Sequence, residues 1–216
     1  IRDRGGVRIN ERCETNLKGL FAAGEVSGGV HGANRMGGNA MVEIIVFGAR
    51  AGRSAAEYAK GSDWLAPDEN PEEEYERLYG FFKEKGITPK SIMDKIAAFM
   101  SEYVGVARTE ADLRKALSEI ESLQSNDLPH MRAPQGRRFN LGWIEAIQVP
   151  YMLEVAQMIV RSAIFRTESR GAHYREDFPD TQSDWLTHTR VTKKAEGMDV
   201  GVTPVVITKF NPEESR

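Results

Sequence analysis

One arginine, Arg35, lies in a loop that otherwise consists mainly of small residues. The loop follows the apolar stretch 20–23 and precedes a helical pattern from about Asn39, and it holds six glycines: Gly24, Gly28, Gly29, Gly32, Gly37 and Gly38. Glycine lacks the Cβ that would hold a ligand away from backbone N–H groups. A guanidinium in such a loop suits a carboxylate or a phosphate, because its planar fork binds two oxygens at once.

The elements on either side of the loop must position this arginine. The apolar residues 20–23 predict a strand, and Glu25 follows directly, where its carboxylate could accept hydrogen bonds from ribose hydroxyls or remain a solvated loop acid. The helix would offer the free N–H groups of Ala40 and Met41, backed by the positive end of its dipole. Asn39 is either a plain N-cap or a ligand contact.

Several motifs occur in a characteristic order. They are GLFAAGE, HGANR, GGNA and VFGARAG near the start, ESRGAHYREDFP at 168–179 and TPVVITKFNPEE at 203–214. Together they resemble the flavoprotein subunit of succinate dehydrogenase and fumarate reductase, whose superfamily includes L-aspartate oxidase. The resemblance covers nearly the whole chain, and HGANR with ESRGAH carries more weight than any lone glycine motif.

This resemblance implies an enzyme that interconverts succinate and fumarate by hydride transfer at FAD. It makes Arg35 the catalytic clamp on the dicarboxylate and Glu25 a ribose contact of FAD. It brings Ala40 and Met41 to the pyrimidine edge of the flavin, where the family more often has Ser-Leu, and leaves Asn39 as a further cofactor contact. It also implies an iron–sulfur partner subunit that takes the electrons. L-aspartate oxidase and a non-enzymatic helical interaction module remain alternatives.

A glycine-rich GxGxxG turn for the FAD pyrophosphate does not occur in the sequence. We therefore expect a C-terminal fragment, the end of the FAD-binding domain plus a helical domain, that is inactive by itself. Cys13 is the only cysteine. It cannot supply the thiolates of an iron–sulfur cluster, and no metal site is expected.

Composition and charge bear on two other properties, nucleic-acid binding and membrane attachment. A net charge of −3, without a basic stripe, gives no reason to expect nucleic-acid binding. No apolar run approaches the length of a membrane span, so membrane attachment would be indirect, through partner subunits. We expect a cytoplasmic protein, or one held by its partners at the inner face of the cell membrane.

The patterning predicts an α+β fold that is mainly α. Residues 1–60 would form a partial FAD-binding domain with few strands and one helix, followed by a linker at 61–70. Residues 71–168 would form a three-helix, spectrin-like antiparallel bundle, and 169–216 a C-terminal extension with a strand at 205–210. Helices are expected over 72–85, from Thr88-Pro89, from Thr109, and over 140–166 with a kink or break at Pro150.

A dense charged cluster at 166–179 has two interpretations. One is a buried ion-pair network that locks the helical domain onto the FAD domain; the other is direct catalytic contact. We favour the network, with Arg170 and His173 as residues that support the site from behind. His188 is expected to be structural.

Overall fold

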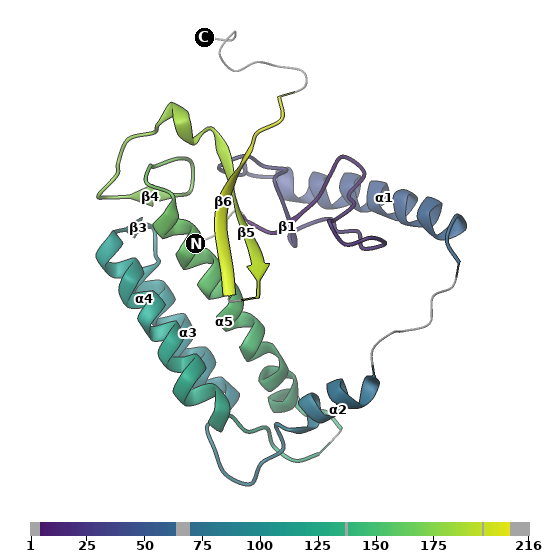
Figure 1. Cartoon of the computed structure of the whole chain (residues 1–216), viewed down its shortest axis with the longest axis vertical. Helices are drawn as coiled ribbons and strands as arrows, with labels where there is room; N and C mark the ends of the chain where they lie inside the picture. Colours follow the sequence, from purple (N-terminus) through teal and green to yellow (C-terminus); the bar gives the residue numbers. More distant parts are fainter. Residues whose placement is uncertain (1–4, 64–69, 137, 196, 208–216) are drawn as a thin grey trace. The chain divides into compact units, whose positions relative to one another are not determined.

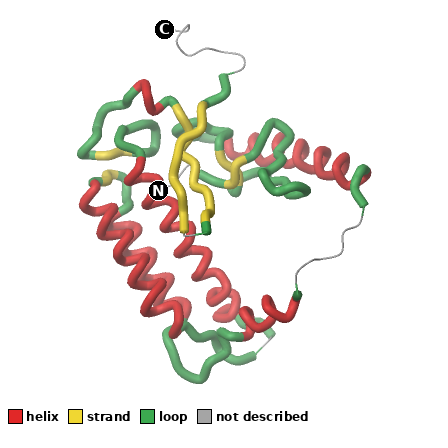
Figure 2. The backbone as a smooth tube through the Cα atoms, in the orientation of Figure 1, coloured by secondary structure: helices red, strands yellow, loops and turns green. Residues whose placement is uncertain are grey.

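The computed structural model describes residues 5–63, 70–136, 138–195 and 197–207, and these divide into two compact units (Figure 1). The first unit comprises the described part of 1–69 together with 170–173. The second comprises the described parts of 70–169 and 174–216. Helices dominate and the strands are mostly short (Figure 2). The predicted α+β, mainly α fold is therefore confirmed.

The first unit is built around a long helix and a small parallel pair of strands. Helix α1 spans Asn39–Lys60, and β1 (Val7–Arg8) pairs with β2 (Ser27–Gly28). The pair requires glycine at position 6, because a Cβ there would lie 2.5 Å from the carbonyl oxygen of Val26. The glycine loop is thereby held against the beginning of the described chain.

The strand expected at 20–23 does not form. Only an isolated bridge joins Phe21 to Glu14, together with bonds from the Thr15 amide to the Leu20 carbonyl and from the Ala22 amide to the Cys13 carbonyl. Apolar residues become a strand only where a ladder partner runs beside them. In the described residues, this segment pairs only with the short stretch 13–15.

Four helices begin the second unit: α2 (Pro71–Tyr79), α3 (Pro89–Tyr103), α4 (Glu110–Ser122) and α5 (Leu141–Phe165). Each has an N-cap side chain that accepts a backbone N–H, from Asn70, Thr88, Thr109 and Asn140 respectively. Such caps satisfy amides that the first helical turn leaves open. The predicted starts at Thr88-Pro89 and Thr109 are therefore correct.

Two helix predictions need correction. Helix α2 ends at Tyr79 rather than near Lys85, because Gly80 caps it and the following residues form turns. Helix α5 runs through Pro150 without a break. Packing against neighbouring helices can outweigh the one hydrogen bond that proline removes. A short π-helical segment (Leu123–Asp127) and a 3₁₀ turn (Leu128–His130) follow α4.

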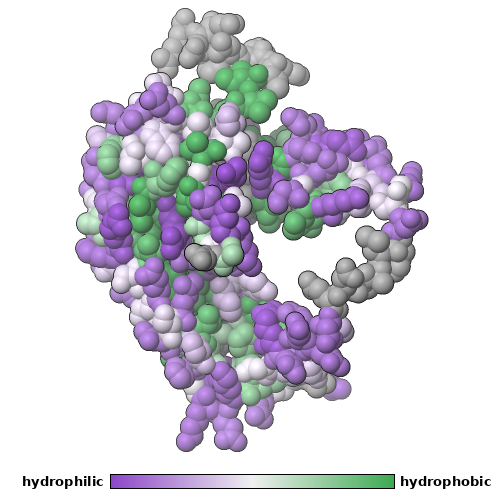
Figure 3. Space-filling view, in the orientation of Figure 1, coloured by the Kyte–Doolittle hydropathy of each residue, from purple (hydrophilic) through white to green (hydrophobic). Residues whose placement is uncertain are grey.

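Helices α3, α4 and α5 pack on one another as a bundle (Figure 1). Its fully buried side chains include Ile92 on α3, Leu113 and Ile120 on α4, and Val149 and Leu153 on α5. Over these helices the surface seen in Figure 3 is mainly polar, with apolar side chains showing between them. The amphipathic spacing in the sequence thus produces the expected three-helix core.

The end of the described chain forms a hairpin. Strand β5 (Thr187–Lys194) pairs antiparallel with β6 (Gly197–Pro204), after a 3₁₀ turn (Ser183–Trp185). Earlier, β3 (Ala107–Arg108) pairs parallel with β4 (Tyr174–Arg175). The strand predicted at 205–210 is misplaced, because β6 ends at Pro204 and 205–207 have no strand; 208–210 lie outside the described residues.

Two further predictions concern the hairpin and the linker. His188 lies on β5 opposite Thr203, and its side chain is exposed. Most of the predicted linker, 64–69, lies outside the described residues.

Among the helices that are described, none combines the length and the apolar character needed to cross a membrane.

Candidate functional site

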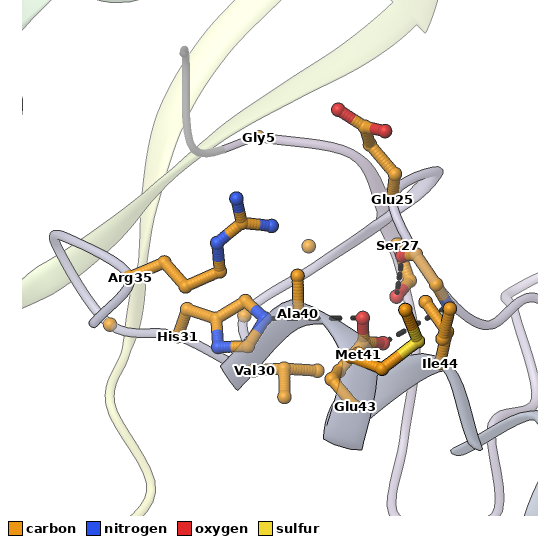
Figure 4. Close-up of a pocket in the computed structure, with 14 residues that line it drawn as sticks. Gly5, Glu25, Ser27, Val30, His31, Arg35, Ala40, Met41, Glu43 and Ile44 are labelled. Atoms are coloured by element: carbon orange, nitrogen blue, oxygen red, sulfur yellow. Dashed lines mark hydrogen bonds and ion pairs between the residues drawn. The ribbon is translucent and has the colours of Figure 1, made fainter. Parts of the chain in front are cut away.

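The glycine loop and the start of α1 enclose a concavity of about 240 Å³ in the first unit (Figure 4). Its walls come from Gly5, from residues 24, 25 and 27–32, from Arg35 and from the first turns of α1. Complete ligand pockets usually hold about 300–1,000 Å³. These residues therefore form part of a binding site rather than a whole one.

Four of the five predicted site residues line this concavity: Glu25, Arg35, Ala40 and Met41. The Arg35 side chain is half-buried and extends toward the space above Ala40, while Glu25 lies across the space from it (Figure 4). The structure thus brings the arginine and the helix start to one place, as the sequence predicted. Their roles remain predictions.

Asn39 is the fifth predicted residue and lies apart from the other four. It is exposed and is not among the residues that line the concavity. It is also not the N-cap, because α1 is capped by Gly38, whose φ of 86° takes the backbone out of the helical region. The N-cap interpretation of Asn39 is wrong; its contact with a cofactor stays a prediction.

The start of α1 has no side-chain cap. The first N–H groups of a helix have no acceptor within the helix and carry its positive dipole end. Ala40 and Met41 contribute to the concavity from this first turn. Together with the Arg35 guanidinium, they place hydrogen-bond donors and positive charge in this part of the concavity, which Glu25 and Glu43 also line.

Glu25 is presented by a tight turn. The carbonyl of Gly24 accepts hydrogen bonds from the backbone N–H of Ser27 (2.9 Å) and from its hydroxyl (2.8 Å). These bonds close a four-residue turn with Glu25 and Val26 at its tip. The exposed carboxylate of Glu25 therefore has a defined place at one edge of the concavity.

A buried acid that the sequence reasoning missed also lines the concavity. Glu43 is 7% exposed; it accepts the N–H of Gly24 at 3.0 Å, and its other oxygen lies 3.9 Å from Nε2 of His31. The sequence held a signal for it, because Glu43 is the only charged residue between Arg35 and Arg50. A lone charge on an apolar helix face usually has a buried partner.

The second part of the ESRGAH motif, residues 170–173, meets the HGANR segment within the first unit. The amide of Ala172 donates to the carbonyl of Ala33 at 3.1 Å. A Cβ on Gly171, where φ is +60°, would lie 2.3 Å from the same oxygen, so glycine is required. Arg170 and His173 bond to each other through their backbones and do not line the concavity. The segment that holds them therefore contacts the HGANR loop through Ala172, and their predicted supporting role stays a prediction.

The rest of the charged cluster forms ion pairs in the second unit. Arg175 is fully buried and pairs with Asp177 at 2.7 Å and with Glu110 at 3.1 Å. The hydrogen bonds from Arg175 lower the pKa of Asp177 from 3.8 to about 2, and Asp177 in turn raises the pKa of Arg175. Arg166 pairs with the buried Glu168. The contacts form an ion-pair network around the buried Arg175 and Glu168, as predicted. These members all lie within the second unit, and the predicted locking of the helical domain onto the FAD domain stays a prediction.

The donor set fits part of a flavin nucleotide and an anionic substrate. The helix start lacks a side-chain cap and a guanidinium lies beside it, and Gly29 and Gly32 leave open space where side chains would otherwise stand. Backbone N–H groups in such a place suit phosphate, carboxylate or the polar edge of a ring system. The residues present are compatible with FAD.

Comparison with known proteins first gives the class. Residues 3–41, which include the glycine loop, match the FAD binding domain model. Residues 93–216 match the model described as "Fumarate reductase flavoprotein C-term". This chain belongs to the fumarate reductase flavoprotein family, which confirms the predicted resemblance, and the match to the FAD binding domain model supports FAD as the cofactor.

Individual relatives agree with this assignment. A fumarate reductase (CoM/CoB) protein from Methanothermobacter marburgensis is 44% identical over 91% of this chain and 36% of its own length. The fumarate reductase flavoprotein subunit of Haemophilus influenzae is 35% identical over 96% and 36%. A structure of E. coli quinol fumarate reductase superimposes with a TM-score of 0.86, at 31% identity, over 96% of this chain and 37% of that one. The chain thus spans about a third of the length of these relatives.

Proposed function

We propose that this chain forms the C-terminal part of the flavoprotein subunit of a succinate dehydrogenase or fumarate reductase. The whole subunit would interconvert succinate and fumarate. The observation that supports this most is the placement of a half-buried Arg35 in one concavity with the start of α1, which has no side-chain cap. The Arg35 guanidinium would then bind the substrate, and the backbone N–H groups of the helix start would bind the cofactor.

The cofactor would lie against the helix start. FAD, when bound, supplies the chemistry of accepting or donating a hydride. The N–H groups of Ala40 and Met41 would donate to the polar edge of its ring, since both residues line the concavity. Glu25, at the tip of its turn, would accept hydrogen bonds from ribose hydroxyls. Asn39, exposed at the first helical position, would contribute at the margin at most.

Arg35 would orient the substrate. A guanidinium binds one carboxylate of a dicarboxylate through two parallel hydrogen bonds. This contact fixes the direction of the substrate and draws electron density from it, and correct orientation can account for several kcal/mol of a reaction barrier. Because Arg35 is half-buried, its charge is less screened than that of a surface arginine.

The electron partner is proposed to be an iron–sulfur subunit of the same complex. The only cysteine, Cys13, is buried and lies close to the carbonyl of Phe47, so this chain supplies no cluster ligands. The complex would work in the cytoplasm or at the inner face of the cell membrane, attached through its other subunits. The matched family favours this function over L-aspartate oxidase and over a non-enzymatic helical module.

Replacing Arg35 by lysine in the complete subunit tests this proposal. Lysine keeps the charge but not the fork, so we expect succinate oxidation with an artificial acceptor to fall in kcat/KM by about a hundredfold, equivalent to ~2.7 kcal/mol. Arg53→Lys is the matched control, because Arg53 is exposed on α1 outside the concavity. Equal activity of the two variants would refute the clamp.

A second assay on the complete subunit distinguishes the proposed enzyme from L-aspartate oxidase. L-aspartate oxidase would consume aspartate under oxygen and release peroxide. If the complete subunit did so and left succinate unchanged, the dicarboxylate oxidoreductase would be the wrong function.

A further inference from the structure

Glu43 is a buried acid that has no role in the proposed binding of FAD or of the dicarboxylate. Its side chain is 7% exposed, although it belongs to an otherwise apolar run on α1. Burying a carboxylate is costly unless hydrogen bonds compensate it. A carboxylate in this position therefore needs partners, and the question is which residues supply them.

Its two oxygens reach two different parts of the glycine loop. Oε1 accepts the backbone N–H of Gly24 at 3.0 Å, and Oε2 lies 3.9 Å from the imidazole Nε2 of His31 (Figure 4). Side chains of a helix lean toward its N-terminus. Glu43 starts one turn into α1 and can therefore reach back to the loop that precedes the helix.

The two contacted residues, Gly24 and His31, are close in sequence to residues of the proposed site. Gly24 is the base of the turn that presents Glu25, because its carbonyl also accepts both hydrogen bonds from Ser27. His31 begins the HGANR segment, which leads directly to Arg35. A displacement of Gly24 or His31 would therefore move the cofactor contact or the substrate clamp.

We propose that Glu43 is a positioning residue that fastens the start and the middle of the glycine loop, at Gly24 and His31, to the first turns of α1. It sets the distance between Glu25, Arg35 and the N–H groups of the helix start without touching substrate itself. The inference rests on the proposed function where it speaks of FAD and dicarboxylate. The attachment of the loop stands on the contacts alone.

Two substitutions separate the two contacts. Glu43→Ala leaves the Gly24 amide without its acceptor. Glu43→Gln keeps an oxygen that can accept from Gly24 but removes the charge that faces His31. Glu57→Ala and Glu57→Gln are matched controls, because Glu57 is an exposed glutamate of the same helix and pairs only at the surface with Arg12.

The first measurement is hydrogen exchange at the Gly24 amide. A hydrogen bond to a charged group commonly corresponds to about a tenfold or greater change in an equilibrium. We expect Glu43→Ala to speed Gly24 exchange by about tenfold or more, and Glu43→Gln to stay within about threefold of the parent. Exchange in Glu43→Ala that matches Glu57→Ala would overturn the attachment.

The second measurement is made on the complete subunit. Glu43→Ala should raise the KM for succinate and the rate of FAD loss by about tenfold each, and Glu43→Gln should restore most of both. Faster exchange at Gly24 with unchanged KM and FAD retention would overturn the positioning role. If Glu43→Ala does not fold, Glu43→Gln still provides a test. Because Glu43→Gln lacks the charge opposite His31, its KM for succinate must exceed that of Glu57→Gln. Equal KM values would reject the proposal.

Failure of the proposed function has a different signature. A parent subunit that neither retains FAD nor oxidises succinate would disprove that function. Exchange at Gly24 would still decide whether Glu43 fastens the loop.

Discussion

Replacing Asp177 by asparagine should weaken the helical unit by a predictable amount. Asp177 accepts two hydrogen bonds from the fully buried Arg175, at 2.7 Å from Nε and 2.8 Å from Nη2. It also accepts the backbone N–H of Glu110 at the start of α4, at 2.8 Å. Asparagine removes the negative charge and one acceptor oxygen, and the buried guanidinium keeps Glu110 as its remaining carboxylate partner.

The size of the effect follows from the acidity of Asp177. Its pKa falls from 3.8 to about 2, and a tenfold change in acid dissociation is worth about 1.36 kcal/mol. The side chain is 30% exposed, so solvent screening reduces the gain to about 1–2 kcal/mol. Weakening the pairing of a buried arginine adds to this loss. We expect about 2–3 kcal/mol in total, or a Tm lower by about 4–12 °C.

Chemical denaturation followed by tryptophan fluorescence measures this loss, because Trp143 and Trp185 both belong to the second unit. Asp94→Asn is the matched control: Asp94 is an exposed residue of α3 that pairs with Lys90 at the surface, and its loss should cost less than about 0.5 kcal/mol. Equal unfolding free energies for the two variants at pH 7 would refute the reasoning.

The pH dependence of stability tests the same contact independently. Because the folded pKa of Asp177 is lowered, its contribution is complete above the unfolded pKa of about 3.9. It is lost as the pH falls toward about 2. The parent should therefore lose stability more steeply than Asp177→Asn between about pH 4 and pH 2. Parallel curves for parent and variant over this interval would contradict the assigned pKa.

Two further substitutions test local features of each unit. Gly6→Ala should lower stability by about 2 kcal/mol more than Gly5→Ala in thermal unfolding, because a Cβ at position 6 would meet the Val26 carbonyl at 2.5 Å whereas one at position 5 has no atom within 4 Å. Equal Tm values would contradict the close strand approach. Thr88→Ala should cost about 1 kcal/mol in denaturant, because the Thr88 hydroxyl accepts the Ser91 amide at the start of α3; a change below ~0.3 kcal/mol would show that the cap contributes little.

The helical bundle was the part most accessible to sequence reasoning. The Thr88-Pro89 pair marks the start of α3 through a cap and a fixed φ, both of which are local properties. The kink or break predicted at Pro150 was wrong because that prediction used only the local effect of proline. Helix α5 packs along α3 and α4 and stays continuous. Local signals predict where helices begin, and packing decides where they continue.

The site was predictable in composition and less so in geometry. The resemblance and the glycine loop together indicated Arg35, Ala40 and Met41, and all three line one concavity. The capping of α1 by Gly38 was not foreseen, because a glycine with positive φ leaves no side-chain signature. Glu43 was missed because its partners, a backbone amide and a histidine in a loop, become visible only when the loop is folded.

The most direct test is an experimental structure of the complete subunit with FAD and a bound dicarboxylate. We expect the Arg35 guanidinium to donate two hydrogen bonds to one carboxylate of the ligand, and the cofactor to lie against the N–H groups of Ala40 and Met41. A dicarboxylate bound beyond the reach of Arg35, with the concavity at the start of α1 filled by other protein residues, would contradict this expectation.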